Sequence, residues 1–231
     1  MNSSNLRIVS DILDFNKNKP DDIYIDFDKK NITTIYSMIV GPTSTPYFGG
    51  YFFFRICFPS NYPSTSPNVT FLTTDGDVRF NPNLYANGKV CLSILGTWTG
   101  PKWEPVMTLK SVLLSIQSLL CNIPLRNEPG YTNVNEMDSI SLQYTQYVIF
   151  NVYNIAIIDI LNKKLISLEI YSKFENIIIN NFKKNYINLK NDILSYSEIY
   201  GNLLLLNSPY NIKTKYLNFI ELSNTFVKLE I

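Results

Sequence analysis

A stretch with two turns and one cysteine constrains the fold of this chain more than any other part of its sequence. In Asn81-Pro82-Asn83, proline fixes φ and the asparagine side chains can bond to nearby backbone groups, which predicts a tight turn. Asn87-Gly88 predicts a second turn. Cys91 follows in a short apolar run, eight positions after Asn83. The two turns would hold this thiol at a fixed position, as a nucleophile requires.

The length and composition predict one globular domain, or one domain with an extension. The chain has 231 residues, of which 45% are hydrophobic, so it can bury a sizeable core. Its formal net charge is +1, which provides no strong field to attract nucleic acid or anionic lipid. We therefore expect no nucleic-acid partner and no membrane partner, but partners that are recognised by shape.

Histidine is absent from the chain, and cysteine occurs only three times. A cysteine hydrolase uses an imidazole to form its thiolate, and catalytic zinc sites draw on histidine, so both kinds of site are disfavoured. Thioester exchange needs no strong internal base, because a partly ionised thiol attacks an acyl group that is already activated. The odd number of cysteines, without metal-ligand spacing and without a signal peptide, favours free thiols in the cytoplasm or the nucleus.

The first third of the chain predicts a helix followed by strands. In residues 4–16, Leu6, Val9 and Leu13 recur at helical spacing and would form the apolar face, with Ile12 on its flank. The runs that follow are rich in β-branched and aromatic residues and are separated by turn residues, which predicts a four-stranded antiparallel meander. The predicted strands are residues 23–27, 32–40, 51–58 and 68–73.

Helical spacing returns after the central stretch. Thr108 is placed to cap a helix with a broad apolar stripe, and residues 139–161 predict another helix, which polar residues interrupt too often for a membrane span. With no repeat and no flexible linker, residues 162–231 are predicted to form a helical extension packed on a core domain of residues 1–161. Its helix-like segments lie near residues 173–187, 190–206 and 215–230.

This order of elements resembles that of the ubiquitin-conjugating enzymes, the E2 class. The resemblance rests on the Asn81-Pro82-Asn83 turn, on Cys91 and on the helix from Thr108. It also includes Tyr62-Pro63 in the preceding loop, and Trp103 followed by Pro105. Residues 87–103, 115–119 and 127–130 are similar in particular to the branch called conjugating enzyme Z. The resemblance covers residues 1–161 and implies the α+β ubiquitin-conjugating (UBC) fold, with an N-terminal helix, a four-stranded antiparallel meander and further helices.

The resemblance also implies roles for individual residues. Cys91 would accept ubiquitin or a ubiquitin-like modifier as a thioester from an activating enzyme and pass it to a substrate lysine or to a ligase. Asn83 matches an asparagine that steadies the active-site loop or stabilises the oxyanion, although it would also serve simply to close a turn. Glu128 falls near an acidic position that flanks the thiol, and the alternative is a solvated loop carboxylate. Cys57 and Cys121 are expected to serve packing.

The chain departs from the family pattern at several positions. Asn81 stands where the family's turn begins with histidine, Ser93 replaces an acid two positions after the cysteine, and Ser64 replaces a bulky apolar residue of the ligase-binding loop. Ser93 can hydrogen-bond an attacking lysine but supplies no charge. No metal or cofactor is implied, because the activating enzyme consumes the ATP. The alternative function is a non-catalytic scaffold that binds ubiquitin or a ligase, which the retained Cys91 disfavours.

Overall fold

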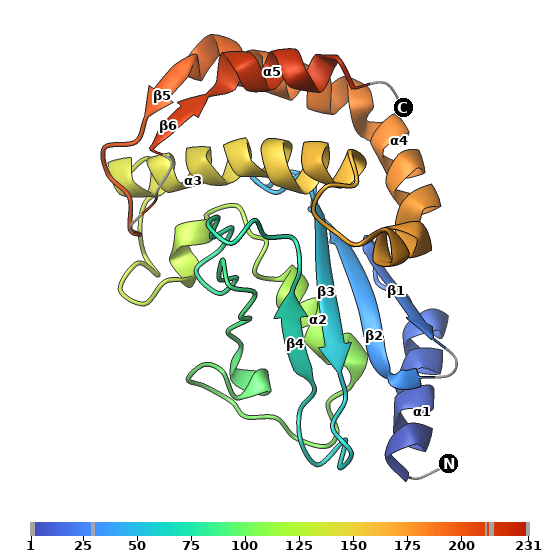
Figure 1. The fold of residues 1–231 in the computed structure, drawn as a ribbon. Coiled ribbons are helices and arrows are strands. Elements are labelled where there is room, and N and C mark those ends of the chain that lie inside the picture. Colours follow the sequence, from blue (N-terminus) through green and yellow to red (C-terminus); the bar gives the residue numbers. More distant parts are fainter. Residues whose placement is uncertain (1–2, 29–30, 211, 213–214, 230–231) are drawn as a thin grey trace.

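The fold is built around a four-stranded antiparallel sheet with helices on both faces (Figure 1). It is seen in a computed structural model that describes residues 3–28, 31–210, 212 and 215–229. The strands follow one another in the order β1-β2-β3-β4, so the predicted meander is confirmed. Their bounds are Ile23–Asp28 for β1, Asn31–Val40 for β2, Tyr51–Cys57 for β3 and Asn68–Phe71 for β4.

Residues 37–40 of β2 and 51–54 of β3 are buried on both faces, which explains why these two segments are mostly apolar. Ile39 pairs with Phe52 on one face, and Met38 pairs with Phe53 on the other. Ile39 and Phe52 belong to the main core, together with apolar residues of the helices α1, α2 and α3. Met38 and Phe53 belong to a second cluster that includes residues of helix α4. Because side chains alternate along a strand, each face needs its own covering helices.

The helices follow the predicted order. Thr108 caps α2 by accepting a hydrogen bond from the backbone N–H of Ser111 at 3.3 Å, as the sequence predicts. The predicted helix over residues 139–161 begins as α3 and continues as a π-helix, Val152–Asp159. The α-helices are α1, Ser3–Lys17; α2, Leu109–Gln117; α3, Ser139–Asn151; α4, Leu168–Tyr200; and α5, Phe219–Val227. Short 3₁₀ turns occupy Ser93–Leu95 and Pro124–Asn127.

The predicted apolar face of α1 is wrong. Leu6 and Leu13 are 58% and 63% exposed, whereas Ile8, Ile12 and Phe15 are buried in the main core. Two apolar stripes at helical spacing run along this helix, so periodicity alone could not decide which one faces inward.

The extension differs from its prediction in two ways. Helix α4 runs without a break through residues 168–200, where two helices were predicted near 173–187 and 190–206. It ends at Gly201, whose φ of 52° lies in the region that glycine adopts most easily. The chain then forms a two-stranded antiparallel sheet, β5 Asn202–Leu204 and β6 Tyr216–Asn218, before α5. Leu203 and Leu217 are paired in this sheet, which gives the hairpin an apolar face that the helical prediction missed.

The extension packs closely on the rest of the chain, with α4 crossing the outer face of the sheet and then running beside α3 (Figure 1). Tyr51 of β3 donates a hydrogen bond to the carbonyl of Ile178 at 3.0 Å, and Tyr153 of the π-helix donates to the carbonyl of Leu189 at 3.0 Å. Buried side chains of α4 therefore belong to the same clusters as those of the sheet. The division of the chain at residue 161 stays a prediction.

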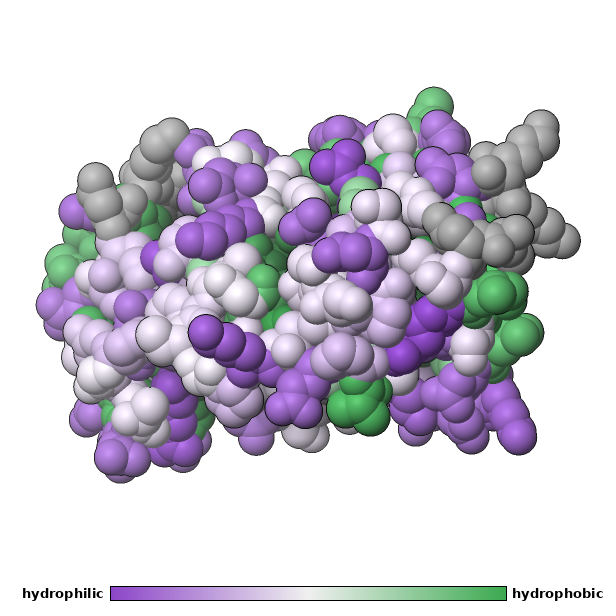
Figure 2. Space-filling model, turned by 90° about the horizontal axis from the view of Figure 1, so that it is seen from below, coloured by the Kyte–Doolittle hydropathy of each residue, from purple (hydrophilic) through white to green (hydrophobic). Residues whose placement is uncertain are grey.

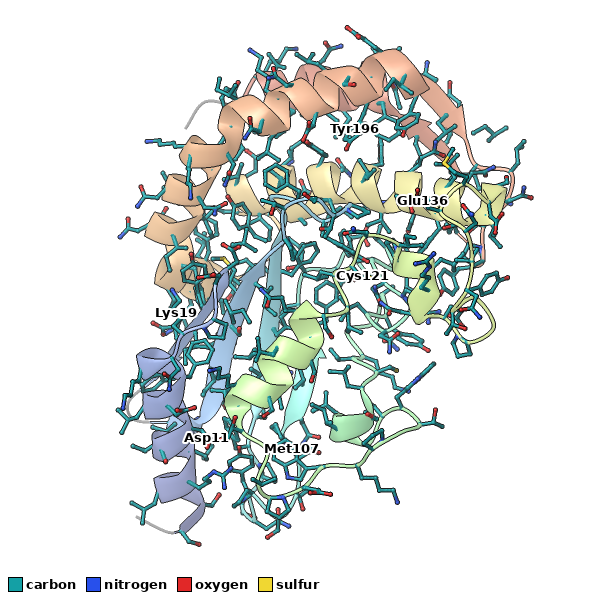
Figure 3. The ribbon with its side chains drawn as sticks, turned by 180° about the vertical axis from the view of Figure 1, so that it is seen from behind. Asp11, Lys19, Met107, Cys121, Glu136 and Tyr196 are labelled. Atoms are coloured by element: carbon teal, nitrogen blue, oxygen red, sulfur yellow. The ribbon has the colours of Figure 1, made fainter. Side chains whose placement is uncertain are left out.

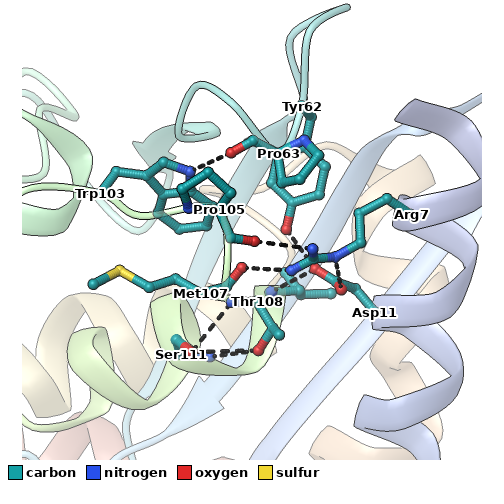
Figure 4. A network of polar contacts seen from close by, with 10 residues as sticks. Arg7, Asp11, Tyr62, Pro63, Trp103, Pro105, Met107, Thr108 and Ser111 are labelled. Carbon is teal, nitrogen blue, oxygen red and sulfur yellow. Dashed lines mark hydrogen bonds and ion pairs between the residues drawn. The ribbon is translucent and has the colours of Figure 1, made fainter. Parts of the chain in front are cut away.

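A buried carboxylate ties α1 to the start of α2. Asp11 is 3% exposed, and its side chain accepts hydrogen bonds from Arg7 Nε at 2.8 Å, from the hydroxyl of Tyr62 and from the backbone N–H of Leu109 at 3.0 Å (Figure 4). Burial and the neighbouring Asp11 carboxylate raise the pKa of Tyr62, so its phenol stays protonated as a donor.

Arg7 extends this network to the loop that precedes α2. Its guanidinium donates to the carbonyls of Pro105 and Met107 at 2.9 and 2.8 Å, and Trp103 Nε1 donates to the carbonyl of Pro63 at 2.7 Å (Figure 4). These bonds join three segments that are far apart in the sequence.

From below, the surface is mostly hydrophilic or neutral, with hydrophobic residues in small separate areas (Figure 2). Of the helices in the described residues, none combines the length and apolar character needed to cross a membrane.

Replacing Asp11 should weaken the fold. Asp11→Ala leaves the donors from Tyr62 and Leu109 without a buried partner and strands the charge of Arg7, so we expect the free energy of unfolding to fall by about 3 kcal/mol. Urea denaturation followed by circular dichroism measures this change. Asp14→Ala is the matched control, because Asp14 lies on the exposed side of the same helix. Equal losses in the two variants would contradict a central role for the Asp11 network.

Candidate active site

The turn before the candidate nucleophile is organised by the buried amide of Asn81. Its Nδ2 donates to the hydroxyl of Tyr47 at 2.9 Å and to the carbonyl of Leu119 at 2.8 Å. Its Oδ1 accepts from the backbone N–H of Asn83 at 3.0 Å. This one side chain, which we call the Asn81 hub, therefore joins the β2–β3 loop, the end of the α2 region and the turn itself.

Tyr47 completes the hub on the side of the β2–β3 loop. Its hydroxyl donates to the carbonyl of Phe80 at 2.8 Å while it accepts from Asn81. Burial raises the pKa of Tyr47 well above its ordinary value, so the phenol keeps the proton that this arrangement needs. Asn81, the residue that departs from the family's histidine, thus has a structural role at the base of the turn.

Asn83 and Cys91 are joined by a pair of hydrogen bonds. The backbone N–H of Cys91 donates to the carbonyl of Asn83 at 2.9 Å, and Asn83 Nδ2 donates to the carbonyl of Cys91 at 2.7 Å. The Asn83 side chain is thus bonded to the backbone of Cys91, as a residue that steadies the loop would be. Its buried Oδ1 has no hydrogen-bond partner among the described residues.

Cys91 is buried, with 1% of its surface exposed. The segment that follows folds back toward it: Thr97 Oγ1 donates to the carbonyl of Val90 at 2.7 Å and accepts from the backbone N–H of Leu92 at 3.0 Å. The backbone N–H of Thr97 also donates to the carbonyl of Leu92 at 3.2 Å. Thr97 therefore clasps both neighbours of the cysteine, and because Cys91 is almost fully buried, its Sγ becomes accessible only when the surrounding structure opens.

Ser93 begins the 3₁₀ turn directly after the cysteine segment. Its side chain packs against the backbone of Gly100, where a Cβ atom would lie only 3.1 Å from Ser93 Cβ. Gly100 also has φ of 131°, so a larger residue there would be strained. The close approach holds the end of the 92–100 segment beside Ser93.

Glu128 lies beside two residues that the sequence did not connect with it. Its carboxylate accepts a hydrogen bond from the hydroxyl of Tyr210, in the extension, and lies 3.8 Å from Arg79 Nη2. The guanidinium of Arg79 is stacked between the rings of Tyr85 and Tyr210, at 3.9 and 4.1 Å from their centroids, and also donates to the carbonyl of Pro82. The extension thus reaches the turn that carries Asn83.

The other two cysteines have different surroundings. Cys57 is half-buried rather than in the core, with its Sγ 4.0 Å from Thr34 Oγ1. Cys121 is also half-buried and donates to the carbonyl of Ile123 at 3.4 Å, and burial raises the pKa of its thiol. Within the described ranges, no group of three or more cysteine, aspartate or glutamate side chains is placed to hold a metal ion.

Comparison with known proteins agrees with this arrangement. The sequence model of the family described as "Ubiquitin-conjugating enzyme" matches residues 7–148, which include the sheet, the Asn81 hub and Cys91. The chain belongs to the ubiquitin-conjugating enzyme family. Within the family it is similar to the Z branch: it is 44% identical over 160 residues to ubiquitin-conjugating enzyme E2 Z of Xenopus tropicalis, a match that covers 69% of this chain and 51% of that protein.

Two further matches show how far the similarity extends. Ubiquitin-conjugating enzyme E2 Z of Homo sapiens is 43% identical over 160 residues, with 69% of this chain and 45% of that protein covered. The chain therefore spans about half the length of these relatives. A structure of human ubiquitin-conjugating enzyme E2 G1 is 30% identical and covers 51% of this chain and 94% of that one, with a TM-score of 0.45.

Several residues around Cys91 and Glu128 were not found from the sequence. Tyr47 and Thr97 lie in loops and act through single hydroxyl groups, and Tyr210 is 82 positions from Glu128. No periodicity or spacing marks such contacts. An amide at position 81 in place of a histidine was the one sequence signal that pointed to a structural hub.

Loosening the Thr97 clasp should expose the thiol of Cys91. Thr97→Val keeps the shape of the side chain but removes its hydroxyl, and loss of about 1 kcal/mol from the closed form would raise the open population roughly fivefold. Alkylation by iodoacetamide, followed at each cysteine by mass spectrometry, should quicken about fivefold at Cys91. Thr99→Val, on the same exposed segment, is the control and should change nothing. An unchanged rate in Thr97→Val would show that the clasp does not limit access.

Proposed function

We propose that this chain is an active ubiquitin-conjugating enzyme that carries ubiquitin, or a ubiquitin-like modifier, as a thioester on Cys91. The observation that carries the proposal is the pair of hydrogen bonds that fixes the backbone of Cys91 to Asn83. Membership of the family supports it, since the match includes both residues. The partners would be an activating enzyme, a ligase and the lysines of protein substrates, in the cytoplasm and also the nucleus.

The proposed reaction has two acyl transfers. In the first, the Cys91 thiolate attacks the thioester carbonyl between the modifier and the activating enzyme, a new C–S bond forms, and the thiolate of the activating enzyme leaves. In the second, a neutral lysine amine or a ligase thiolate attacks the carbonyl on Cys91, whose thiolate then leaves. With lysine the product is an isopeptide, and the amine loses a proton. Neither transfer requires a metal or a redox cofactor.

The oxyanion formed in each transfer needs nearby hydrogen-bond donors. In the resting structure Asn83 Nδ2 is already bonded to the carbonyl of Cys91, so a direct role in stabilising the oxyanion would require this bond to open. We therefore propose that Asn83 acts mainly by holding the cysteine segment in place. The alternative function is a scaffold without catalysis, in which the burial of Cys91 is permanent.

A charging assay separates the enzyme from the scaffold. The chain is incubated with ubiquitin-activating enzyme, ATP and ubiquitin and run on a non-reducing gel. We expect a modifier adduct that reducing agent removes. Cys91→Ser should give no adduct or an oxyester that resists reduction, because serine forms an ester where cysteine forms a thioester.

Two matched variants control this experiment. Cys57→Ser and Cys121→Ser remove the other thiols and should both keep the reducible adduct. A reducible adduct on Cys91→Ser would refute Cys91 as the acceptor. The absence of any adduct on the parent chain, with a known conjugating enzyme charged in parallel, would favour the scaffold.

Lysine must lose its proton before it can attack. Its amine has a pKa of about 10.4, so on the order of one amine in a thousand is neutral near pH 7. Ser93 supplies no carboxylate to take up this proton, and Glu128 is the acidic residue that we propose to orient the amine and accept its proton. In the structure the Glu128 carboxylate is shared between Tyr210 and Arg79, so this role would require Glu128 to exchange the Tyr210 hydroxyl for the amine.

Two substitutions distinguish a direct role of Glu128 from a structural one. Glu128→Gln should leave charging of Cys91 intact and slow discharge to free lysine about tenfold near pH 7, because the amide cannot take up the proton that the attacking amine must lose. The difference should shrink toward pH 10, where the amine is deprotonated without help. Tyr210→Phe keeps the ring on Arg79 but frees the carboxylate, so it should discharge to lysine at least as fast as the parent.

Single-turnover discharge, measured from pH 7 to pH 10 with the charged enzyme, tests both variants. Equal slowing in Glu128→Gln and Tyr210→Phe at every pH would mean that Glu128 only fastens the extension to the active-site scaffold. Discharge of Glu128→Gln at the parental rate would mean that Ser93 suffices, or that the modifier passes mainly to ligase cysteines.

A further inference from the structure

Two adjoining cavities lie between the β2–β3 loop and helix α4, and no residue of the 79–105 stretch lines either of them. Their volumes are about 290 and 410 Å³, and both are lined by Ser44, Phe48 and Asp192. We call the two together the Asp192 pocket. Each is at or near the lower end of the range of about 300–1,000 Å³ typical of small-ligand sites. Neither cavity alone is large, and each has room for a single side chain.

Asp192 has no cationic partner on its own helix or in the pocket. The residues one turn away on α4 are Asn188, Leu189, Ser195 and Tyr196, and none of them is charged. The lining residues of the two cavities include no lysine or arginine, and Asp192 forms no ion pair within the part of the chain that the structure describes. Burial raises the pKa of Asp192, because partial removal from water disfavours the carboxylate. Asp192 is therefore a half-buried acid with no neighbouring positive charge to balance its carboxylate.

Aromatic rings form the apolar wall of the same pocket. Phe48 comes from the β2–β3 loop, Tyr153 from the start of the π-helix and Tyr196 from α4. Tyr196 lies on the side of α4 that faces α3 (Figure 3). The rings of Tyr153 and Tyr196 meet edge to face, with centroids 6.4 Å apart. The Tyr153 hydroxyl is already donated to the carbonyl of Leu189, so it is not a donor for Asp192.

The loop side of the pocket is held in shape by its own hydrogen bonds. Thr45 Oγ1 donates to the carbonyl of Pro42 at 2.8 Å and accepts from the backbone N–H of Tyr47 at 3.2 Å. Tyr47 is in turn fixed by the Asn81 hub. A wall that is already ordered loses little conformational freedom when a ligand binds, which favours affinity.

We propose that the Asp192 pocket receives the arginine side chain of a protein partner, with the guanidinium paired to Asp192 and lying against the aromatic wall. Arginine is favoured over lysine because its planar guanidinium stacks on aromatic rings and donates to a carboxylate and to hydroxyl and amide oxygens together. Ser44 and Asn188, which line the pocket, carry such oxygens. The site is separate from Cys91, so the proposal does not depend on the proposed conjugating activity.

The molecule itself contains an example of this recognition. Arg79 lies between the rings of Tyr85 and Tyr210, with the carboxylate of Glu128 3.8 Å away. There the arginine and its acceptors belong to one chain. The Asp192 pocket offers the aromatic rings and the carboxylate without the cation.

Binding of a blocked arginine tests the proposal. The probe is N-acetyl-arginine N-methylamide, and its control is the citrulline derivative, which has almost the same shape and no charge. In NMR titrations of the full chain, we expect saturable shifts confined to residues 43–48, 153 and 188–196, with the citrulline derivative about tenfold weaker. Asp192→Asn should weaken arginine binding about tenfold as well.

Matched variants keep the test decisive. Asp192→Asn should melt no lower than the parent at pH 7, because the raised pKa means that the ionised carboxylate costs the folded state stability at that pH and the neutral amide removes this cost. Glu198→Gln removes an exposed acid from the same helix and should bind arginine like the parent. The proposal is overturned if the citrulline derivative binds equally well, if Asp192→Asn keeps the affinity, or if no saturable shifts appear. Equal binding of a third probe, N-acetyl-lysine N-methylamide, would overturn the assignment to a guanidinium.

Discussion

The buried side chain of Asn81 is the interaction on which the site depends. It satisfies the Tyr47 hydroxyl, the Leu119 carbonyl and the Asn83 backbone at once, and none of these groups could turn to water instead. Without this amide the buried backbone N–H of Asn83 would lose its acceptor, and an unsatisfied buried polar group costs about 1–3 kcal/mol, so Asn81 favours a single arrangement of the turn. Cys91 is bonded to that turn through Asn83 and takes its position from it.

The features that the sequence predicted correctly are local ones. Turns at Asn81-Pro82-Asn83 and Asn87-Gly88, the cap at Thr108 and the four strands all depend on residues close together in the chain, where propensity and spacing carry the information. The order of these elements was enough to indicate the family. The assignments of Glu128 and Ser93 to lysine activation stay predictions.

The features that were missed depend on distant contacts. Two apolar stripes on α1 were equivalent until the sheet covered one of them, and Asp11 could not be recognised as buried without Tyr62 and the start of α2. Helix α4 continues past the predicted break because buried residues on both sides of it, Phe182 and Ile193, pack into the same core. In each case tertiary packing decided between local patterns that were equally good.

The chemistry of the hub has one more consequence. An amide neither gains nor loses a proton in water, and burial moves the pKa of Tyr47 further from neutrality, so the hydrogen bonds around Asn81 are the same in mildly acidic and mildly alkaline solution. An imidazole in the same place would change its charge near pH 6.5. The groups that form this hub therefore do not titrate near neutral pH, and any dependence of the chemistry on pH must arise from the reacting groups themselves.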